Sequence, residues 1–191
     1  FFFFFTSGMT LQSFVKYDEN EMMHLLTRSM GVGLTLAACL ILLQYPIEKI
    51  AFMFIETSLE VEHLASVYFR ICIWGAPAVL GLYSFSGWFI GMQNSRYPMF
   101  IAIIQNIVNI LVSLCLVYGF DMKIEGIAIG TLTAQYAGFL IAWILWAYHY
   151  YPFRRYAKWN ALTNKQAMYR FFQINRDIFF RTLCLVTVTV F

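Results

Sequence analysis

The stretch that decides the fold is YPMFIAIIQNIVNILVSLCLVYGF, residues 97–120, which contains no charged side chain. A helix that rises about 1.5 Å per residue needs about 20 apolar residues to cross about 30 Å of hydrocarbon. Residues 97–120 meet this requirement, and so do three more uncharged runs at 29–47, 71–95 and 126–153. A buried helix of a water-soluble protein explains one such run but not four in succession. The sequence therefore predicts an all-α polytopic membrane protein.

The composition agrees with a chain whose solvent is lipid. Of its 191 residues 61% are hydrophobic and 12% are charged, whereas soluble domains carry about 25% charged residues. This number of polar groups is too small to cover the surface of a protein in water. The lipid bilayer is therefore the first expected partner. The four cysteines lie in apolar runs without a CxxC pair, so neither a disulfide framework nor a zinc site is predicted.

Both ends of the chain lie in apolar sequence, with five phenylalanines at 1–5 and an uncharged run at 182–191. A protein rarely stops halfway through a membrane span, because the cut helix end would leave carbonyl groups unsatisfied in hydrocarbon. We therefore expect the chain to be part of a longer protein.

Proline positions refine the expected helices, which run near 24–45, 64–90, 97–118 and 126–148. Pro46 marks the exit of the first helix, and Pro98 suits the opening turn of the third, where its missing N–H costs nothing. Pro77 lies inside the second helix and predicts a kink there.

Lysine and arginine predict the orientation in the membrane. The connectors at about 12–28, 91–97 and 149–181 carry ten of the 13 basic residues. The other three are Lys49, Arg70 and Lys123. The ten-residue group is expected to face the cytoplasm, and the connectors at 46–63 and 119–125 to face the outside. Within 149–181 we expect an amphipathic helix along the inner membrane surface.

Several function classes are excluded by what the sequence lacks. It contains no GxSxG, HExxH or phosphate-binding loop, and no acid, histidine or nucleophile cluster falls within a span, so no enzyme is predicted. The basic residues have a topological explanation, so no nucleic-acid role is expected. His63 stands beside Glu60 and Glu62, but a solvated cluster at a span end explains these residues better than a metal site.

The informative residues are polar groups inside the spans, because each needs a partner or a cavity in lipid. Asn106, Asn109 and Ser113 recur at spacings of three and four and share one helix face, with Gln105 beside them. The last full span adds Thr131 and Gln135. Amide and hydroxyl oxygens suit Na⁺ or a proton-linked hydrogen-bond network. Hydrogen bonding that merely fastens the helices together explains the same residues, and from spacing alone both interpretations stay open.

Several segments, taken in order, resemble one transporter family. They are the residues TSGMT at 6–10, WGAPA at 74–78, GMQNSRYP at 91–98, NIVNI at 106–110, GIAIGT at 126–131 and NRDIF at 175–179. This series is similar to multidrug-and-toxin-extrusion (MATE) transporters, in the DNA-damage-inducible bacterial branch. The resemblance covers essentially the whole chain, from the end of the family's helix 2 into its helix 7.

The family resemblance implies a domain organisation. MATE transporters have twelve helices in two six-helix lobes, so the chain would hold most of one lobe. Residues 1–148 would belong to the N-terminal lobe, 149–174 to the cytoplasmic loop between lobes, and 175–191 to the truncated start of helix 7. The remaining C-terminal lobe would be the partner of this part, which is not expected to transport alone.

The resemblance also implies a function. MATE transporters are secondary antiporters that export small organic, often cationic, compounds in exchange for H⁺ or Na⁺, here in the bacterial inner membrane and with no cofactor beyond the coupling ion. In this branch a helix-1 Asp, an Asn and an Asp on helix 5, and a helix-6 Thr form a cation site. Asn109 and Thr131 match two of these, and Ser113 stands where the second acid is expected. Gln105, Asn106 and Gln135 are the expected cavity-lining residues.

Two alternatives remain at this stage. A lipid-linked oligosaccharide flippase of the same superfamily would have a more cationic cavity, for which Arg70 is the available basic residue. A non-transporting membrane scaffold or receptor would tolerate apolar replacement of the polar face at 106–113.

Overall fold

The computed structural model describes residues 2–16, 19–54 and 59–151, together with the single positions 169, 173, 176, 180, 184 and 187. Every regular element in this part of the chain is helical. The elements are α1 (Phe2–Val15), α2 (Glu19–Leu42), α3 (Gln44–Phe54), α4 (Leu59–Cys72), the 3₁₀ turn η1 (Ile73–Gly75), α5 (Ala76–Gly91), α6 (Arg96–Leu114), the π-helical turn η2 (Cys115–Gly119) and α7 (Ile124–His149). The inner-surface helix expected within 149–181 and the expected start of helix 7 fall outside the described residues, isolated positions apart.

Among the described residues, four helical segments are long and apolar enough to cross a membrane: Glu19–Leu42, Val61–Gly91, Arg96–Gly119 and Ile124–His149. Large apolar side chains such as Ile110, Leu111 and Ile144 are about 60% exposed. Such extensive apolar exposure would drive a water-soluble chain to aggregate, but it is the ordinary surface of a helix in lipid. The protein is thus an all-α polytopic membrane protein, as the four uncharged runs predicted.

The connector expected at 46–63 is largely helical, which corrects the sequence prediction. The first full span ends at Leu42, and α3 begins two residues later with Pro46 in its opening turn. Backbone bonds from Leu43 N to Cys39 O (2.9 Å) and from Ile47 N to Leu43 O (3.0 Å) carry the ladder across the junction. Proline lacks an N–H but fits a helix's first turn, so Pro46 begins a new helix where it was expected to mark an exit.

The kink predicted at Pro77 is present as a short 3₁₀ turn. The α-helical pattern stops at Cys72, passes through η1 and resumes at Ala76, which places Pro77 in the first turn of α5. The Ala76 N–H donates to the Ile73 carbonyl, and the Tyr136 hydroxyl of α7 donates to the Trp74 carbonyl at 2.9 Å. A neighbouring helix therefore satisfies a carbonyl at the break, as membrane helices require.

The described residues form two compact units. The first contains the described residues within 1–32, 83–95 and 145–191 and has an aromatic core. Trp88 is fully buried, and its indole N–H donates to the Met22 carbonyl at 3.0 Å. Its ring lies edge-on to that of Tyr150, with centroids 4.8 Å apart. These contacts join α2, α5 and the end of α7 within this unit.

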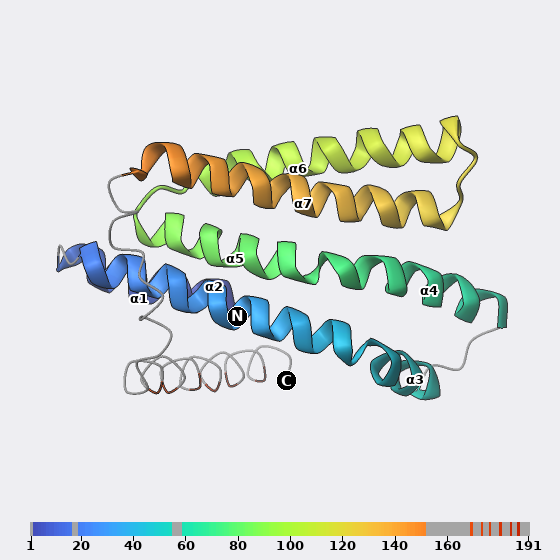
Figure 1. Ribbon diagram of the computed structural model, residues 1–191, viewed down its shortest axis with the longest axis horizontal. Helices are drawn as coiled ribbons and strands as arrows, with labels where there is room; N and C mark the ends of the chain where they lie inside the picture. Colours follow the sequence, from blue (N-terminus) through green and yellow to red (C-terminus); the bar gives the residue numbers. More distant parts are fainter. Residues whose placement is uncertain are drawn as a thin grey trace. The chain divides into compact units, whose positions relative to one another are not determined.

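The second unit contains residues 33–82 and 96–144. In it α6 and α7 lie side by side and antiparallel (Figure 1), since Gly130 faces Ser113 and Gly138 faces Gln105. A Cβ atom on Gly81 of α5 would lie 2.5 Å from the Phe139 ring of α7, so the small residue permits close helix approach there. The second unit holds all six polar residues singled out in the sequence.

Candidate functional site

The polar face of α6 is tied together by its own side chains. The Ser113 hydroxyl donates to the Asn109 Oδ1 at 3.1 Å, one turn earlier on the same helix. Asn106 is exposed, and its amide donates to the Ala102 carbonyl at 2.9 Å. Asn109 and Ser113 are half-buried. Since a side-chain amide exposed to hydrocarbon would be costly, this face of α6 requires a polar cavity or a further polypeptide surface.

The closest approach of α7 to this face occurs at Gly130. A Cβ atom there would lie 2.1 Å from the Ser113 Oγ and 3.0 Å from the Ser113 backbone nitrogen. Only glycine fits such a contact. Thr131 follows directly, and its hydroxyl donates to the Ile127 carbonyl at 3.0 Å. The contact between the two helices therefore places the backbone at Thr131 next to the Asn109–Ser113 pair.

Tyr68 of α4 is a polar residue of this region that the sequence analysis did not single out. Its hydroxyl lies within interacting distance of the Thr131 side chain and of the Cys72 thiol. The uncharged run used to define the second span began at Ile71, after Arg70, so Tyr68 lay outside the segment searched for polar groups. A search for tyrosines within the predicted helix 64–90 would have found it.

Gln135 lies one turn beyond Thr131 on α7 and packs against η1. A Cβ atom on Gly75 would lie 1.7 Å from the Gln135 Oε1. That oxygen is buried and has no hydrogen-bond partner among the described residues. An unsatisfied buried acceptor costs about 1–3 kcal/mol. The side-chain oxygen of Gln135 can therefore accept a hydrogen bond from a ligand.

The predicted site residues thus separate into two groups. Ser113, which bonds with Asn109, lies against Gly130 at the contact between α6 and α7, and Thr131 follows Gly130 and lies near Tyr68 of α4. Gln105 packs instead against Gly138, at 3.3 Å from a Cβ atom there, and Gln135 packs against Gly75. The sequence has no Asp or Glu between Ile71 and Phe120, so α5 and α6 bring no carboxylate to the site.

Arg70, the basic residue of interest for a cationic cavity, forms an ion pair. Its Nε donates to both carboxylate oxygens of Glu48 on α3, at 3.2 and 3.0 Å, and its Nη2 donates to Oε1 at 3.0 Å. The Ser66 hydroxyl donates to the same carboxylate. The hydrogen bonds from Arg70 and then Ser66 hold the pKa of Glu48 below its ordinary value. The charge of Arg70 is therefore matched by Glu48, which leaves no net positive charge there for an anionic lipid-linked sugar.

Arg28 is a second basic residue whose position differs from the prediction. The sequence analysis put it in the connector 12–28, but α2 begins at Glu19 and Arg28 is buried within it. Glu21, on the same helix, interacts with it electrostatically. Within the described residues, no group of three or more His, Cys, Asp and Glu side chains is arranged to hold a metal ion.

Comparison with known proteins bears on this arrangement of polar helices. The model of the MatE family matches residues 3–115, more than half of the chain. The chain belongs to the MATE family. The resemblance drawn from the motifs at 6–10, 74–78 and 91–98 is thereby confirmed, and these motifs lie within the matched range.

A relative of this MATE chain extends the match to nearly its full length. The DNA damage-inducible protein F of Escherichia coli (strain K12) is 28% identical over 187 residues, which cover 94% of the chain. The chain spans 39% of that relative's length. No solved structure matches the chain. Membership of the MATE family agrees with the candidate membrane spans found among the described residues.

Proposed function

We propose that this MATE chain belongs to a secondary antiporter of the bacterial inner membrane that exports organic, often cationic, compounds in exchange for H⁺ or Na⁺. The observation that carries the proposal is that three hydroxyl groups and one amide, from α4, α6 and α7, lie around the contact between Ser113 and Gly130. They belong to Tyr68, Asn109, Ser113 and Thr131. A transporter needs such a polar site in the membrane interior, because both access states must reach it.

The coupling site is assigned to Asn109, Ser113 and Thr131, with Tyr68 as a fourth member. Hydroxyl and amide oxygens are hard ligands that suit Na⁺ or hydrated H⁺. All four groups are neutral, so they orient a cation but do not balance its charge. The counter-charge would come from a carboxylate outside residues 71–120, such as the helix-1 acid that the family resemblance implies. Gln105, Asn106 and Gln135 would line the cavity around this site.

The whole transporter would contain this chain as most of its N-terminal lobe, with the second lobe supplied by the rest of the protein. The match to 39% of a longer relative supports this organisation. The Arg70–Glu48 ion pair favours the antiporter over the flippase. Because Glu48 neutralises the charge of Arg70, this arginine does not offer the unpaired positive charge that the flippase would need.

The proposal is tested on the full-length protein in everted membrane vesicles. A fluorescent lipophilic cation is added outside the vesicles. The vesicle interior is made either more acidic or richer in Na⁺ than the outside. We expect accumulation of the dye with one of the two gradients, and its loss in Asn109→Leu. Dye uptake that depends on neither gradient contradicts antiport, and transport untouched by Asn109→Leu contradicts the assigned site.

A further inference from the structure

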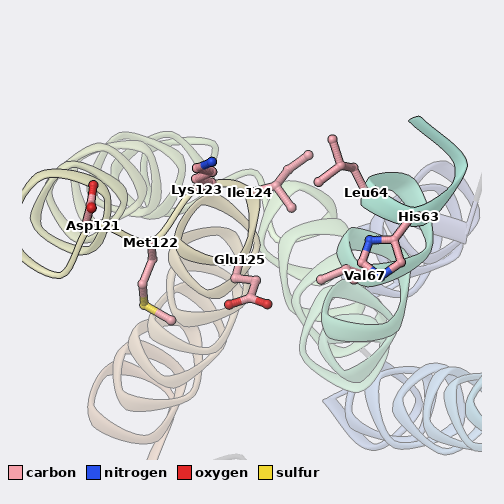
Figure 2. A pocket seen from close by; sticks show the side chains of 8 residues that line it. All are labelled: His63, Leu64, Val67, Asp121, Met122, Lys123, Ile124 and Glu125. Atoms are coloured by element: carbon pink, nitrogen blue, oxygen red, sulfur yellow. The ribbon is translucent and has the colours of Figure 1, made fainter. Parts of the chain in front are cut away.

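A cavity of about 340 Å³ lies between the beginning of α4 and the connector that joins α6 to α7. Figure 2 shows its two sides, with His63, Leu64 and Val67 on one and residues 121–125 on the other. All of these residues belong to the second compact unit. Pockets that hold small ligands begin at about 300 Å³, so the cavity has room for one small organic molecule.

The connector side of the cavity has a defined backbone. After the π-helical turn η2, the Met122 N–H returns to the Leu116 carbonyl at 3.2 Å, and Asp121 adopts a left-handed conformation with φ 55°. Gly126, near the beginning of α7, is buried. A Cβ atom on Gly126 would lie 3.1 Å from Met122 and 3.2 Å from Leu116. These contacts fix the backbone of the turn. The charged residues 121, 123 and 125 are therefore held in defined positions.

The charges and apolar surfaces of the lining define the ligand chemistry. Asp121 and Glu125 contribute two carboxylates, Lys123 contributes one ammonium group, and Leu64, Val67 and Ile124 provide apolar walls. In Figure 2 the Glu125 carboxylate and the His63 imidazole come from opposite sides, while the Lys123 amine lies at the rim. Two carboxylates against one ammonium favour a cation, and the aliphatic walls favour one with a hydrocarbon body.

The cavity also lies at one end of the membrane spans. Its connector joins the spans Arg96–Gly119 and Ile124–His149, and the distribution of basic residues predicts that this connector faces the outside. From the cavity, its lining charges and this position, we propose that the pocket between α4 and the α6–α7 connector is an outer-face binding site for a monovalent organic cation. The proposed binding of a cation is argued from the pocket alone. The further statement that exported substrate binds there during transport rests on the proposed function.

The test uses the full-length protein with all its native cysteines replaced by serine and Leu64→Cys introduced. Leu64 is 39% exposed, so a maleimide can reach the new thiol. Benzyltrimethylammonium is the probe ligand, and benzyl alcohol is its neutral comparison. Met53→Cys serves as the matched thiol control, because Met53 is exposed on α3 and does not line the pocket.

We expect saturating benzyltrimethylammonium to slow modification of Leu64→Cys at least about threefold, and to leave Met53→Cys unaffected. Glu125→Gln should raise the benzyltrimethylammonium concentration that gives half-maximal protection, because about 1 kcal/mol of lost ion pairing corresponds to a roughly fivefold weaker affinity. Asp121→Asn serves as a second variant that keeps the backbone, since Asn tolerates positive φ. Glu62→Gln, which removes the same charge outside the pocket lining, should retain protection.

The proposal is overturned if the cation gives no protection, if benzyl alcohol protects equally, or if the half-protecting concentration is unchanged in both Glu125→Gln and Asp121→Asn. Gradient-driven dye transport is measured on the same preparations. Protection without transport would contradict only the proposed antiport, and transport without protection would contradict only the outer-face site.

Discussion

The Ser113 hydroxyl donates a 3.1 Å hydrogen bond to the Asn109 Oδ1, at the point where α6 comes closest to Gly130 of α7. The bond holds the Asn109 amide in one orientation. The same pair occupies the positions at which the family resemblance expects an amide and an acid. The proposed site therefore has a neutral group where the family resemblance implies a carboxylate.

The first prediction concerns Asn109. Asn109→Leu removes both the acceptor of Ser113 and the proposed cation ligand. We expect gradient-driven export by the full-length protein to fall at least about tenfold, which corresponds to about 1.4 kcal/mol. Transport of a fluorescent cation in everted vesicles measures it. Ile110→Leu, a neighbouring change on an exposed apolar position, should leave export unchanged, and equal losses in the two variants would count against the assignment.

Gly130→Ala should separate α6 from α7. The added methyl would meet the Ser113 hydroxyl at 2.1 Å and its backbone at 3.0–3.1 Å. Overpacking of this kind costs about 1–3 kcal/mol, so the Tm of the purified protein should fall by several degrees. Gly8→Ala is the control, since nothing lies within 4 Å of a Cβ atom there. Adding Ser113→Ala should restore stability only in part, because the backbone contact persists. Full stability of Gly130→Ala would show that the helices are farther apart than described.

Tyr68→Phe removes one hydroxyl and keeps the ring. Since that hydroxyl lies near the Thr131 side chain, the loss of one such polar interaction should cost only about 1 kcal/mol of stability. We expect a larger effect on coupling, seen as a shift in the H⁺ or Na⁺ concentration that gives half-maximal export. Tyr83→Phe, at an exposed position of α5, is the matched control. A Tyr68→Phe protein with the wild-type ion dependence would leave Tyr68 a purely structural residue.

The Glu48–Arg70 pair predicts a pH dependence of stability. The pKa of Glu48 is lowered from 4.5, chiefly by its hydrogen bonds from Arg70. A carboxyl group with a lowered pKa in the folded state stabilises that state fully above its unfolded pKa. This stabilisation is lost as the pH falls from 4.5 through the lowered value. The Tm of the wild-type protein should therefore exceed that of Glu48→Gln at pH 7, and the difference should shrink below pH 4.5.

Its control is Glu62→Gln, which removes a carboxylate that does not bond to Arg70. That variant should show little difference from the wild type at any pH. A Tm difference for Glu48→Gln that stays constant from pH 7 to pH 3 would mean that the ion pair does not stabilise the fold.

The spans were predictable because hydrocarbon imposes a simple rule on length and charge. The uncharged runs gave all four spans, and Pro77 gave the break before α5. The rule failed where a charged residue lies within a helix. Tyr68 was missed because the uncharged run began after Arg70, although the expected helix 64–90 contained it, and the glutamates of 46–63 concealed α3. In both places the charges are satisfied by partners distant in sequence, such as Arg70 and Glu48, and a linear pattern does not reveal such pairing.

The polar residues of the site were predictable as a set, since amides and hydroxyls stand out in apolar runs. Their grouping was not. The spacing of Asn106, Asn109 and Ser113 placed them on one face, but only the contact at Gly130 separates the Asn109–Ser113 pair from Gln105, which packs against Gly138. Glycine has no side chain beyond hydrogen. The glycines of the sequence therefore indicate that helices can approach closely, but not which residue of the neighbouring helix each glycine contacts.

Antiport requires that movement of the organic compound and movement of the coupling ion drive each other. The most direct measurement uses purified full-length protein in proteoliposomes with an enclosed pH- or Na⁺-sensitive dye and no initial ion gradient. When an organic cation gradient alone is imposed, the account predicts H⁺ or Na⁺ flow in the opposite direction, lost in Asn109→Leu. An organic cation flux that moves neither ion, in protein that binds the compound, would contradict it.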